Sequence, residues 1–289
     1  MIFKADLPVF RAAEAVASVG SIEEVLALLR RLTPMDFGRM FLDLPHPDFP
    51  DLSRVLPRMA SEKVQRGWTG DAGYSMYRKT YDFALRLELY FESICRRPLA
   101  GGTILDFGCG WGRMARLMTY FTDPRNLYCL DPLQESINIC VDDGVLGNIR
   151  LSDYHPDTLP IDNARIDLGY AYSVFTHTSE RATRTALNTI RRYMKPDGLF
   201  VITVRPVEIW NLPEFGENKQ VDRAALIEQF AQTGFAFLPN PHIRSDDESV
   251  YGVTTISPDW ISRNFPNWRI VKRDRGEDHS QYILVLQPC

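Results

Sequence analysis

The chain has 289 residues, of which 45% are hydrophobic and 24% are charged, as in an ordinary globular protein. Its formal net charge is -4, whereas proteins that bind nucleic acid or anionic membranes usually carry clustered Lys and Arg. We therefore expect neither of these partners. Acidic Asp6 and Glu14 interrupt the apolar N-terminus, which predicts an amphipathic helix rather than a signal peptide.

The cysteines are widely spaced and odd in number, and no two of them have CxxC spacing: Cys95, Cys109, Cys129, Cys140 and Cys289. The histidines do not cluster with them, so the sequence predicts no metal site. Without a secretory signal, reduced thiols are expected rather than disulfides, which predicts a cytoplasmic location.

Residues 1–98 are expected to form an N-terminal helical extension or cap. Two amphipathic helices are predicted here, and Ser21 with Glu24 has the form of a capping box at the start of the second. Prolines interrupt residues 34–52, which are predicted to be turns and short segments. Aromatic and aliphatic residues at helical spacing predict a longer helix over residues 74–95.

The rest of the chain contains short β-rich runs that predict strands at 103–107, 126–131, 148–153, 166–172, 198–204, 268–276 and 280–287. The first five alternate with helical patterns, which is typical of a parallel sheet covered by helices. Pro196 and Gly198 are predicted to mark the stop before the fifth strand. The last two runs are joined by a short polar turn containing Asp278 and His279, predicted to be solvated, and an antiparallel pair fits them best.

The clearest local signal is a strand that ends in Asp106-Phe107-Gly108-Cys109-Gly110-Trp111-Gly112 and leads directly into a helix. Glycines at these positions let the backbone turn tightly and approach a ligand closely. The dinucleotide fingerprint requires G-x-G-x-x-G, but Arg113 takes the place of its third glycine. The motif is instead an acid followed by G-x-G-x-G, and the carboxylate of Asp106 can pair with the ammonium group of a ligand.

A second acid, Asp131, ends the strand at 126–131. At this position a carboxylate can accept hydrogen bonds from both hydroxyls of a ribose, which indicates a nucleoside ligand without choosing one. Asp153 and Tyr154 follow the third strand. We expect them beside the base, the acid facing an exocyclic amine and the neighbouring side chain forming a wall.

At these residues the chain resembles the class I S-adenosylmethionine-dependent methyltransferases, especially the bacterial small-molecule types. DFGCGWGR is similar to their first motif, LYCLDPL to the acidic second strand, and IDLGYAYSVFTH to the fourth strand with its loop. KPDGLFVITV is similar to the turn and fifth strand, with Asp197 in place of a glycine. The resemblance covers about residues 101–204 and, more loosely, the final elements.

The resemblance implies a Rossmann-like α/β domain over residues 99–289, with strand order 3-2-1-4-5-7-6, strand 7 antiparallel and helices on both faces. It implies S-adenosylmethionine as the cofactor and S-adenosylhomocysteine as the product. The long connection 206–256, with one predicted helix, is expected to be a substrate-side insertion. The residues expected to bind the cofactor are Asp106, Gly108, Cys109, Gly110, Gly112, Asp131, Pro132, Asp153, Tyr154, Ser173, Trp68 and Tyr77.

Several of these side chains have simpler interpretations. Cys109 between two glycines needs only to be small, so packing is favoured over a nucleophile. Trp111 either covers the ligand or anchors the helix, and the sequence does not decide. Trp68, Tyr74 and Tyr77 can close over the positively charged sulfonium, although core packing is the commoner role of such aromatics.

His177 is the one catalytic candidate. It follows the fourth predicted strand, where open α/β sheets place their ligands, and a neutral imidazole there can take a proton from the acceptor. The alternative is that His177 caps or orients the loop before the helix that begins near Ser179.

The function predicted is methyl transfer to a small-molecule acceptor that the sequence does not identify. A non-catalytic S-adenosylmethionine-binding or scaffold protein of the same fold is the alternative, and Arg113 argues against a third, a nicotinamide-dependent oxidoreductase. The N-terminal helices and the insertion are expected to form the acceptor pocket. Dimerisation is left open.

Overall fold

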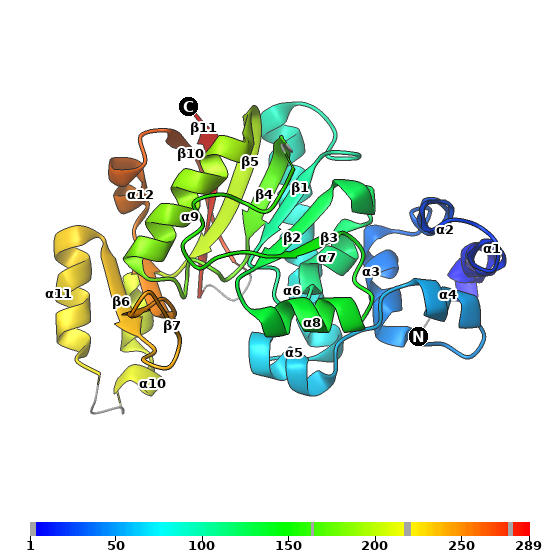
Figure 1. The fold of residues 1–289 in the computed structure, drawn as a ribbon, viewed down its shortest axis with the longest axis horizontal. Helices are drawn as coiled ribbons and strands as arrows, with labels where there is room; N and C mark the ends of the chain where they lie inside the picture. The colour runs from blue at the N-terminus through cyan, green and yellow to red at the C-terminus, as the bar shows by residue number, and fades with distance from the viewer. Residues whose placement is uncertain (1–3, 163–164, 217–220, 277–279) are drawn as a thin grey trace. The chain divides into compact units, whose positions relative to one another are not determined.

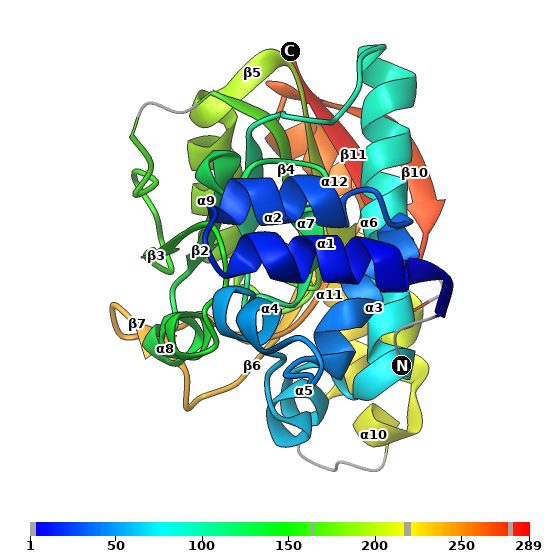
Figure 2. The ribbon, with the colours of Figure 1, turned by 90° about the vertical axis from the view of Figure 1, so that its right-hand side faces the viewer.

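The computed structural model describes residues 4–162, 165–216, 221–276 and 280–289 (Figures 1 and 2). The backbone groups into two units, Met1–Leu151 and Ser152–Cys289, which are taken in turn. The domain boundary expected at residue 98 falls inside the first unit and stays a prediction. Asp278 and His279, expected in a solvated turn, lie outside the described residues.

The first unit begins with a series of helices, as the amphipathic patterns predict. They are a 3₁₀ helix at Lys4–Asp6, α1 at Leu7–Ala17, α2 at Ile22–Leu29, α3 at Pro34–Asp43, α4 at Pro50–Val55, α5 at Glu62–Thr69 and α6 at Gly73–Cys95. Helices α1 and α2 run side by side (Figure 2). The capping box is confirmed: Ser21 Oγ accepts a hydrogen bond from Glu24 N, and the Glu24 carboxylate accepts one from Ser21 N at 2.8 Å.

Most of the proline-rich stretch is helical, contrary to the expectation of mostly turns and short segments, and the expected turn is observed at residues 44–49. Pro34 and Pro50 each stand at the first position of a helix, α3 and α4. At that position a backbone N–H has no partner within the helix, so proline costs nothing there and its fixed φ favours the helical conformation. Thr33 caps α3 by accepting a hydrogen bond from Asp36 N.

Three parallel strands complete the first unit: β1 at Ile104–Phe107, β2 at Leu127–Asp131 and β3 at Asn148–Leu151. Helix α7 at Arg113–Met118 follows β1, and α8 at Gln134–Asp142 follows β2. Every residue of β1 is buried. The expected strand and helix succession is therefore observed, with Asp106 and Asp131 near the carboxyl ends of β1 and β2.

The second unit carries the remaining strands: β4 at Ile166–Ala171, β5 at Met194–Val204, β10 at Trp268–Arg275 and β11 at Tyr282–Pro288. Helix α9 at Glu180–Tyr193 joins β4 to β5, and α12 at Pro258–Asn264 precedes β10. The seven-stranded sheet has the order β10-β11-β5-β4-β1-β2-β3, and β11 runs antiparallel to both β5 and β10. This confirms the expected order 3-2-1-4-5-7-6 of a Rossmann-like methyltransferase fold.

Strand β5 begins earlier than the sequence indicates. It was expected to start at Gly198, but it starts at Met194 and includes Pro196. Its pairing with β4 shifts register between Ile166 and Leu168, which accommodates a proline that has no N–H to donate. Gly198 lies in the same irregular stretch, where a Cβ would come within 2.8 Å of a backbone carbonyl oxygen.

The insertion at 206–256 contains more structure than the one expected helix. That helix, α11 at Arg223–Thr233, lies against β6 at Phe235–Pro239 (Figure 1). The insertion also contains a 3₁₀ helix at Val207–Asn211, α10 at Pro213–Gly216, and the strands β7 at Arg244–Ser245, β8 at Glu248–Ser249 and β9 at Gly252–Ile256. Strand β9 pairs with β6, and fully buried Trp210 anchors a small apolar core of the insertion.

No helix in the described part of the chain is long and apolar enough to cross a membrane.

The close packing of α3 against α6 and α7 gives a test of the first unit. A Cβ added at Gly38 would come within 2.6 Å of the Tyr77 hydroxyl oxygen and 2.9 Å of Leu117. Gly38→Ala is therefore expected to lower the free energy of unfolding by about 1 to 3 kcal/mol, as overpacking does. Urea unfolding measures the change.

Gly67→Ala is the matched control, because Gly67 is also helical and a Cβ there meets nothing within 4 Å. Its expected effect is a gain of up to about 1 kcal/mol from helix propensity. Equal stability changes in the two variants would contradict the packing described here.

Candidate functional site

The loop between β1 and α7 takes a backbone conformation that explains its glycines. Gly108, Gly110 and Gly112 have φ angles of 77°, 54° and 76°, in the left-handed region that side chains disfavour. Gly112 is also crowded, because a Cβ there would lie 3.0 Å from two methyl carbons of Val145. The loop therefore exposes bare backbone at Gly110 and packs closely at Gly112.

Asp131 at the end of β2 fixes this loop. Its Oδ2 accepts a hydrogen bond from Gly110 N at 2.9 Å, and its Oδ1 accepts one from Leu133 N at 2.9 Å. Burial raises the pKa of this carboxyl, and the two backbone hydrogen bonds oppose that rise. Pro132 lies in the bend between β2 and α8. The structure thus brings together the two motifs on which the prediction of a nucleoside site depends.

Trp68 on α5 lies over the same glycine. Two ring carbons of Trp68 are 3.5 Å from the point where a Cβ of Gly110 would stand. The side chain is 41% exposed, so its ring contacts the loop with one part while the rest faces solvent. Trp68 therefore contacts the glycine loop, and its expected closure over the sulfonium stays a prediction.

Trp111, in contrast, anchors the loop from inside. Its side chain is buried at 2% exposure, in a cluster with Ala60 and Met76. Of the two roles that the sequence left open, anchoring is the one observed.

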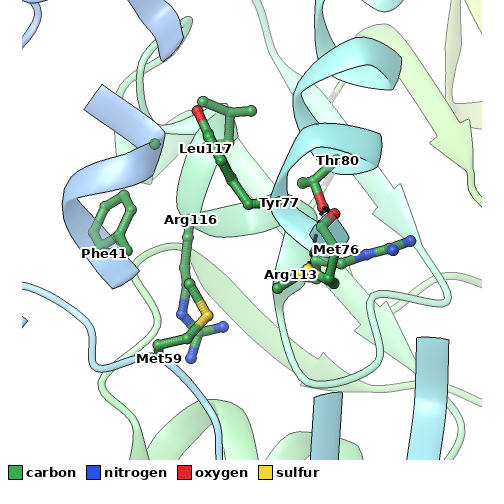
Figure 3. A pocket seen from close by; sticks show the side chains of 9 residues that line it. Phe41, Met59, Met76, Tyr77, Thr80, Arg113, Arg116 and Leu117 are labelled. Carbon is green, nitrogen blue, oxygen red and sulfur yellow. Dashed lines mark hydrogen bonds between the residues drawn. The ribbon is translucent and has the colours of Figure 1, made fainter. Parts of the chain in front are cut away.

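Tyr77 is placed in the packing between helices. Its hydroxyl donates a hydrogen bond to Met35 O at 2.6 Å, and burial raises its pKa. Figure 3 shows it at a narrow pocket between α3, which contributes Phe41, and α6, which contributes Met76 and Thr80. The core-packing alternative therefore describes Tyr77 in this structure, and cofactor contact by this residue stays a prediction.

Two further residues of the loop region are buried: Asp106 on β1 at 2% exposure and Cys109 at 6%. A hydrogen bond with Cys140, together with burial, raises the pKa of the Cys109 thiol well above its ordinary value. A thiol held protonated is a poor nucleophile. Packing is thus the role that the geometry favours for the Cys109 side chain.

Sequence patterns missed Arg116 on α7, whose side chain bonds to the loop. Its guanidinium is 1% exposed and donates to Trp111 O at 2.7 Å and to Gly112 O at 2.9 Å. It also donates to Arg58 O at 3.0 and 2.6 Å and to the Asp143 carboxylate at 3.1 Å. Burial lowers its pKa to about 10, so it stays charged at neutral pH. In the sequence, Arg116 differs from a solvated arginine only in standing among the apolar residues of α7.

The remaining predicted residues belong to the second unit. Asp153 is exposed and Tyr154 is partly buried, in the segment after β3. Ser173 follows β4 with a φ of 61°, an uncommon value outside glycine. Its N–H donates to Thr203 Oγ1 at 2.7 Å and its hydroxyl bonds to the Gln281 amide. Such backbone conformations occur often at functional sites.

His177 is fixed through both ring nitrogens. Nδ1 donates to Gly252 O at 2.7 Å and Nε2 accepts from Arg205 at 3.3 Å, since a carbonyl only accepts and a guanidinium only donates. Tyr251 stacks on the ring with an interplanar angle of 2°. Burial and then the charge of Arg205 lower the pKa of His177 to about 4. The imidazole is therefore neutral, and a role as a base requires Arg205 to release Nε2.

The insertion is attached to this loop by backbone hydrogen bonds. Ser179 N donates to Val250 O at 3.1 Å, and Gly252 N donates to His177 O at 2.8 Å. Thr254 N donates to Thr176 O at 2.9 Å. The end of the insertion thus runs antiparallel to the loop that follows β4.

In a comparison with protein families, residues 104–198 match the family described as "Methyltransferase domain". None of the curated protein sequences matches the chain.

Solved structures that resemble the chain include an S-adenosylmethionine-dependent methyltransferase from Clostridium acetobutylicum, 10% identical, with a TM-score of 0.48 over 73% of this chain and 92% of that one. The CcbJ methyltransferase from Streptomyces caelestis is 13% identical, with a TM-score of 0.47 over 75% and 97% of the two chains. The magnesium protoporphyrin IX methyltransferase from Synechocystis, solved with bound SAH, is 10% identical, with a TM-score of 0.45 over 78% and 92%.

The pKa of His177 predicts how stability depends on pH. Because that pKa is about 4 in the folded chain and 6.5 ordinarily, the unfolded chain binds more protons between these values. The free energy of unfolding should therefore fall as the pH drops from 7 to 4, and His177 should account for about 2 to 3 kcal/mol of that fall.

His177→Gln removes this titration and keeps an amide that can donate and accept. Urea unfolding at pH 7 and pH 4 should show a smaller loss for the variant than for the wild type. The same loss in both proteins would contradict the neutral, buried state of His177.

Proposed function

We propose that this chain, whose residues 104–198 form a methyltransferase domain, uses S-adenosylmethionine to methylate a small-molecule acceptor. The observation that carries the proposal is the convergence of three features on one loop. Asp131 bonds to Gly110 N, Trp68 lies 3.5 Å from the Cβ position of Gly110, and the glycine itself presents bare backbone.

The Asp131 carboxylate suits the ribose of the proposed donor. An ionised carboxylate has about four lone-pair sites, and Gly110 N and Leu133 N each bond to a different oxygen of Asp131. The Ser136 side chain also interacts with this carboxylate, and the lone-pair site that is left is proposed to accept a ribose hydroxyl. The backbone bonds orient the carboxylate before any ligand arrives, which reduces the entropy cost of binding.

The other contacts to the donor follow from the family resemblance. We propose that Asp106 pairs with the ammonium of the methionine moiety and that the backbone at Gly108, Gly110 and Gly112 lies along the ligand. Asp153 and Tyr154 are proposed at the adenine, and Ser173 near the methionine end. Trp68 is proposed to cover the sulfonium, whose positive charge an aromatic face attracts.

When bound, S-adenosylmethionine supplies an electrophilic methyl group, so the protein mainly has to align the acceptor and exclude water. We keep His177 as the candidate proton acceptor on the acceptor side. A pKa of about 4 makes it a weak base, and it can act only if Arg205 moves away from Nε2. Orientation of the loop is the role that its observed bonds support.

The acceptor is proposed to be small and not a nucleic acid, given the net charge of -4. The N-terminal helices and the insertion at 206–256 are proposed to shape its pocket. A cytoplasmic location is proposed from the cysteines, none of which forms a disulfide in the part of the chain that the structure describes.

The donor site is tested by titrating S-adenosylhomocysteine into the pure protein in a calorimeter. Asp131→Asn is expected to weaken binding about tenfold, since one carboxylate oxygen becomes an amide donor that faces a backbone N–H. Gly110→Arg should abolish binding, because the arginine backbone would have to adopt a φ of 54° and its side chain would start beside the Trp68 ring.

Asp123→Asn is the matched control. Asp123 precedes the amino end of β2, opposite to Asp131, and bonds to Arg125. The affinity of the Asp123→Asn variant for S-adenosylhomocysteine should equal that of the wild type. A wild-type protein that binds neither S-adenosylmethionine nor S-adenosylhomocysteine would end the proposal. Binding without turnover in a broad screen of small acceptors would replace it with the non-catalytic alternative.

A further inference from the structure

We propose that Arg116 is a positioning residue of the donor site: its buried guanidinium holds the backbone carbonyls of the glycine loop in the conformation that binds S-adenosylmethionine. This inference rests on the proposed function. Arg116 lies on α7, beyond the glycine motif, and reaches back to Trp111 O and Gly112 O. It lies outside the DFGCGWGR motif at residues 106–113, and the inference depends on its own contacts.

The hydrogen bonds of Arg116 match its donors in number. A guanidinium has five N–H donors in a fixed planar arrangement, and five hydrogen bonds extend from Arg116. Four of them end on backbone carbonyls, and the fifth ends on the Asp143 carboxylate. If one of these acceptors moved away, a donor of the buried charge would lose its hydrogen bond, which is costly. The guanidinium therefore favours the present arrangement of its acceptors.

Those acceptors come from three parts of the first unit. Trp111 and Gly112 belong to the loop, Asp143 directly follows α8, and Arg58 precedes α5. Helix α5 carries Trp68, which contacts Gly110. The guanidinium thus links the loop to the segment that leads to its cover. The Arg116 side chain also lies over the Trp111 ring at 5.2 Å, which holds the loop from a second side.

A lysine cannot replace these bonds. Its ammonium has three donors on a flexible stem, so Arg116→Lys leaves at least two of the present bonds unmade. If the bonds shape the loop, the variant should lose affinity for S-adenosylhomocysteine even where it is fully folded. A role in stability alone would lower the unfolding midpoint and leave the affinity of the folded protein unchanged.

Arg30→Lys is the matched control, because Arg30 makes the same kind of contact at the opposite end of α7. Its guanidinium donates to Thr119 O at 2.8 and 3.0 Å and to Thr122 O at 2.7 Å. Both substitutions therefore remove a guanidinium from backbone carbonyls near one helix, but only Arg116 contacts the glycine loop.

The experiment measures calorimetric affinity for S-adenosylhomocysteine and urea unfolding for wild type, Arg116→Lys and Arg30→Lys, at a temperature where all three are folded. We expect Arg116→Lys to weaken binding about tenfold and Arg30→Lys to change it less than about twofold, whatever their stabilities. Asp143→Asn removes only the charge of one acceptor and should weaken binding by a factor between those of Arg116→Lys and Arg30→Lys. It replaces Arg116→Lys in the test if that variant does not fold.

The outcomes separate the two proposals. If the wild type binds and Arg116→Lys and Asp143→Asn both bind as tightly as Arg30→Lys, the positioning role is wrong and the donor site stands. If the wild type does not bind, the proposed function itself fails.

Discussion

The first unit is organised around the need to satisfy one buried positive charge, that of Arg116. Moving a guanidinium out of water costs several kcal/mol unless each of its donors finds an acceptor. Here the acceptors are carbonyls of the glycine loop, the carbonyl of Arg58 and the carboxylate that follows α8. The charge can be buried only when these segments are all in place. The conformation of the loop is therefore tied to the assembly of its surroundings.

Asp131 is the acidic counterpart of Arg116 at this loop. Arg116 takes carbonyl oxygens at 111 and 112, whereas Asp131 takes the amide of Gly110. Three peptide groups of the loop are thus held by charged side chains, one by Asp131 and two by Arg116. Gly110 and Gly112 have positive φ angles, which favour glycine. A glycine loop without further contacts would lose conformational entropy when a ligand binds. The two charged side chains remove that freedom before a ligand is present.

The sequence predicted those features that depend on local pattern. Strand β1, the glycine loop, Asp131 at the end of β2 and the antiparallel β10–β11 pair all follow from periodicity and turn residues within a few positions of one another. The buried contacts could not be predicted in this way. Arg116 reaches Arg58, 58 positions earlier, and no local rule distinguishes it from a solvated arginine. The helices at Pro34 and Pro50 were missed because proline breaks a helix interior but suits a first turn.

The second unit shows the same dependence of chemistry on distant contacts. His177 stands in a motif that invites a catalytic interpretation, yet its ring chemistry is decided by Gly252 in the insertion and by Arg205 after β5. Burial and then the charge of Arg205 at Nε2 keep the ring neutral and lower its basicity, whereas the hydrogen bond to the Gly252 carbonyl at Nδ1 acts in the opposite direction. In the fold, His177 therefore helps to attach the insertion to the loop after β4, through its ring and its backbone carbonyl. Any motion that frees Nε2 has to displace Arg205, which also donates to Thr176 O. The environment of Nε2 is thus coupled to the hydrogen bonding of that loop through a single guanidinium.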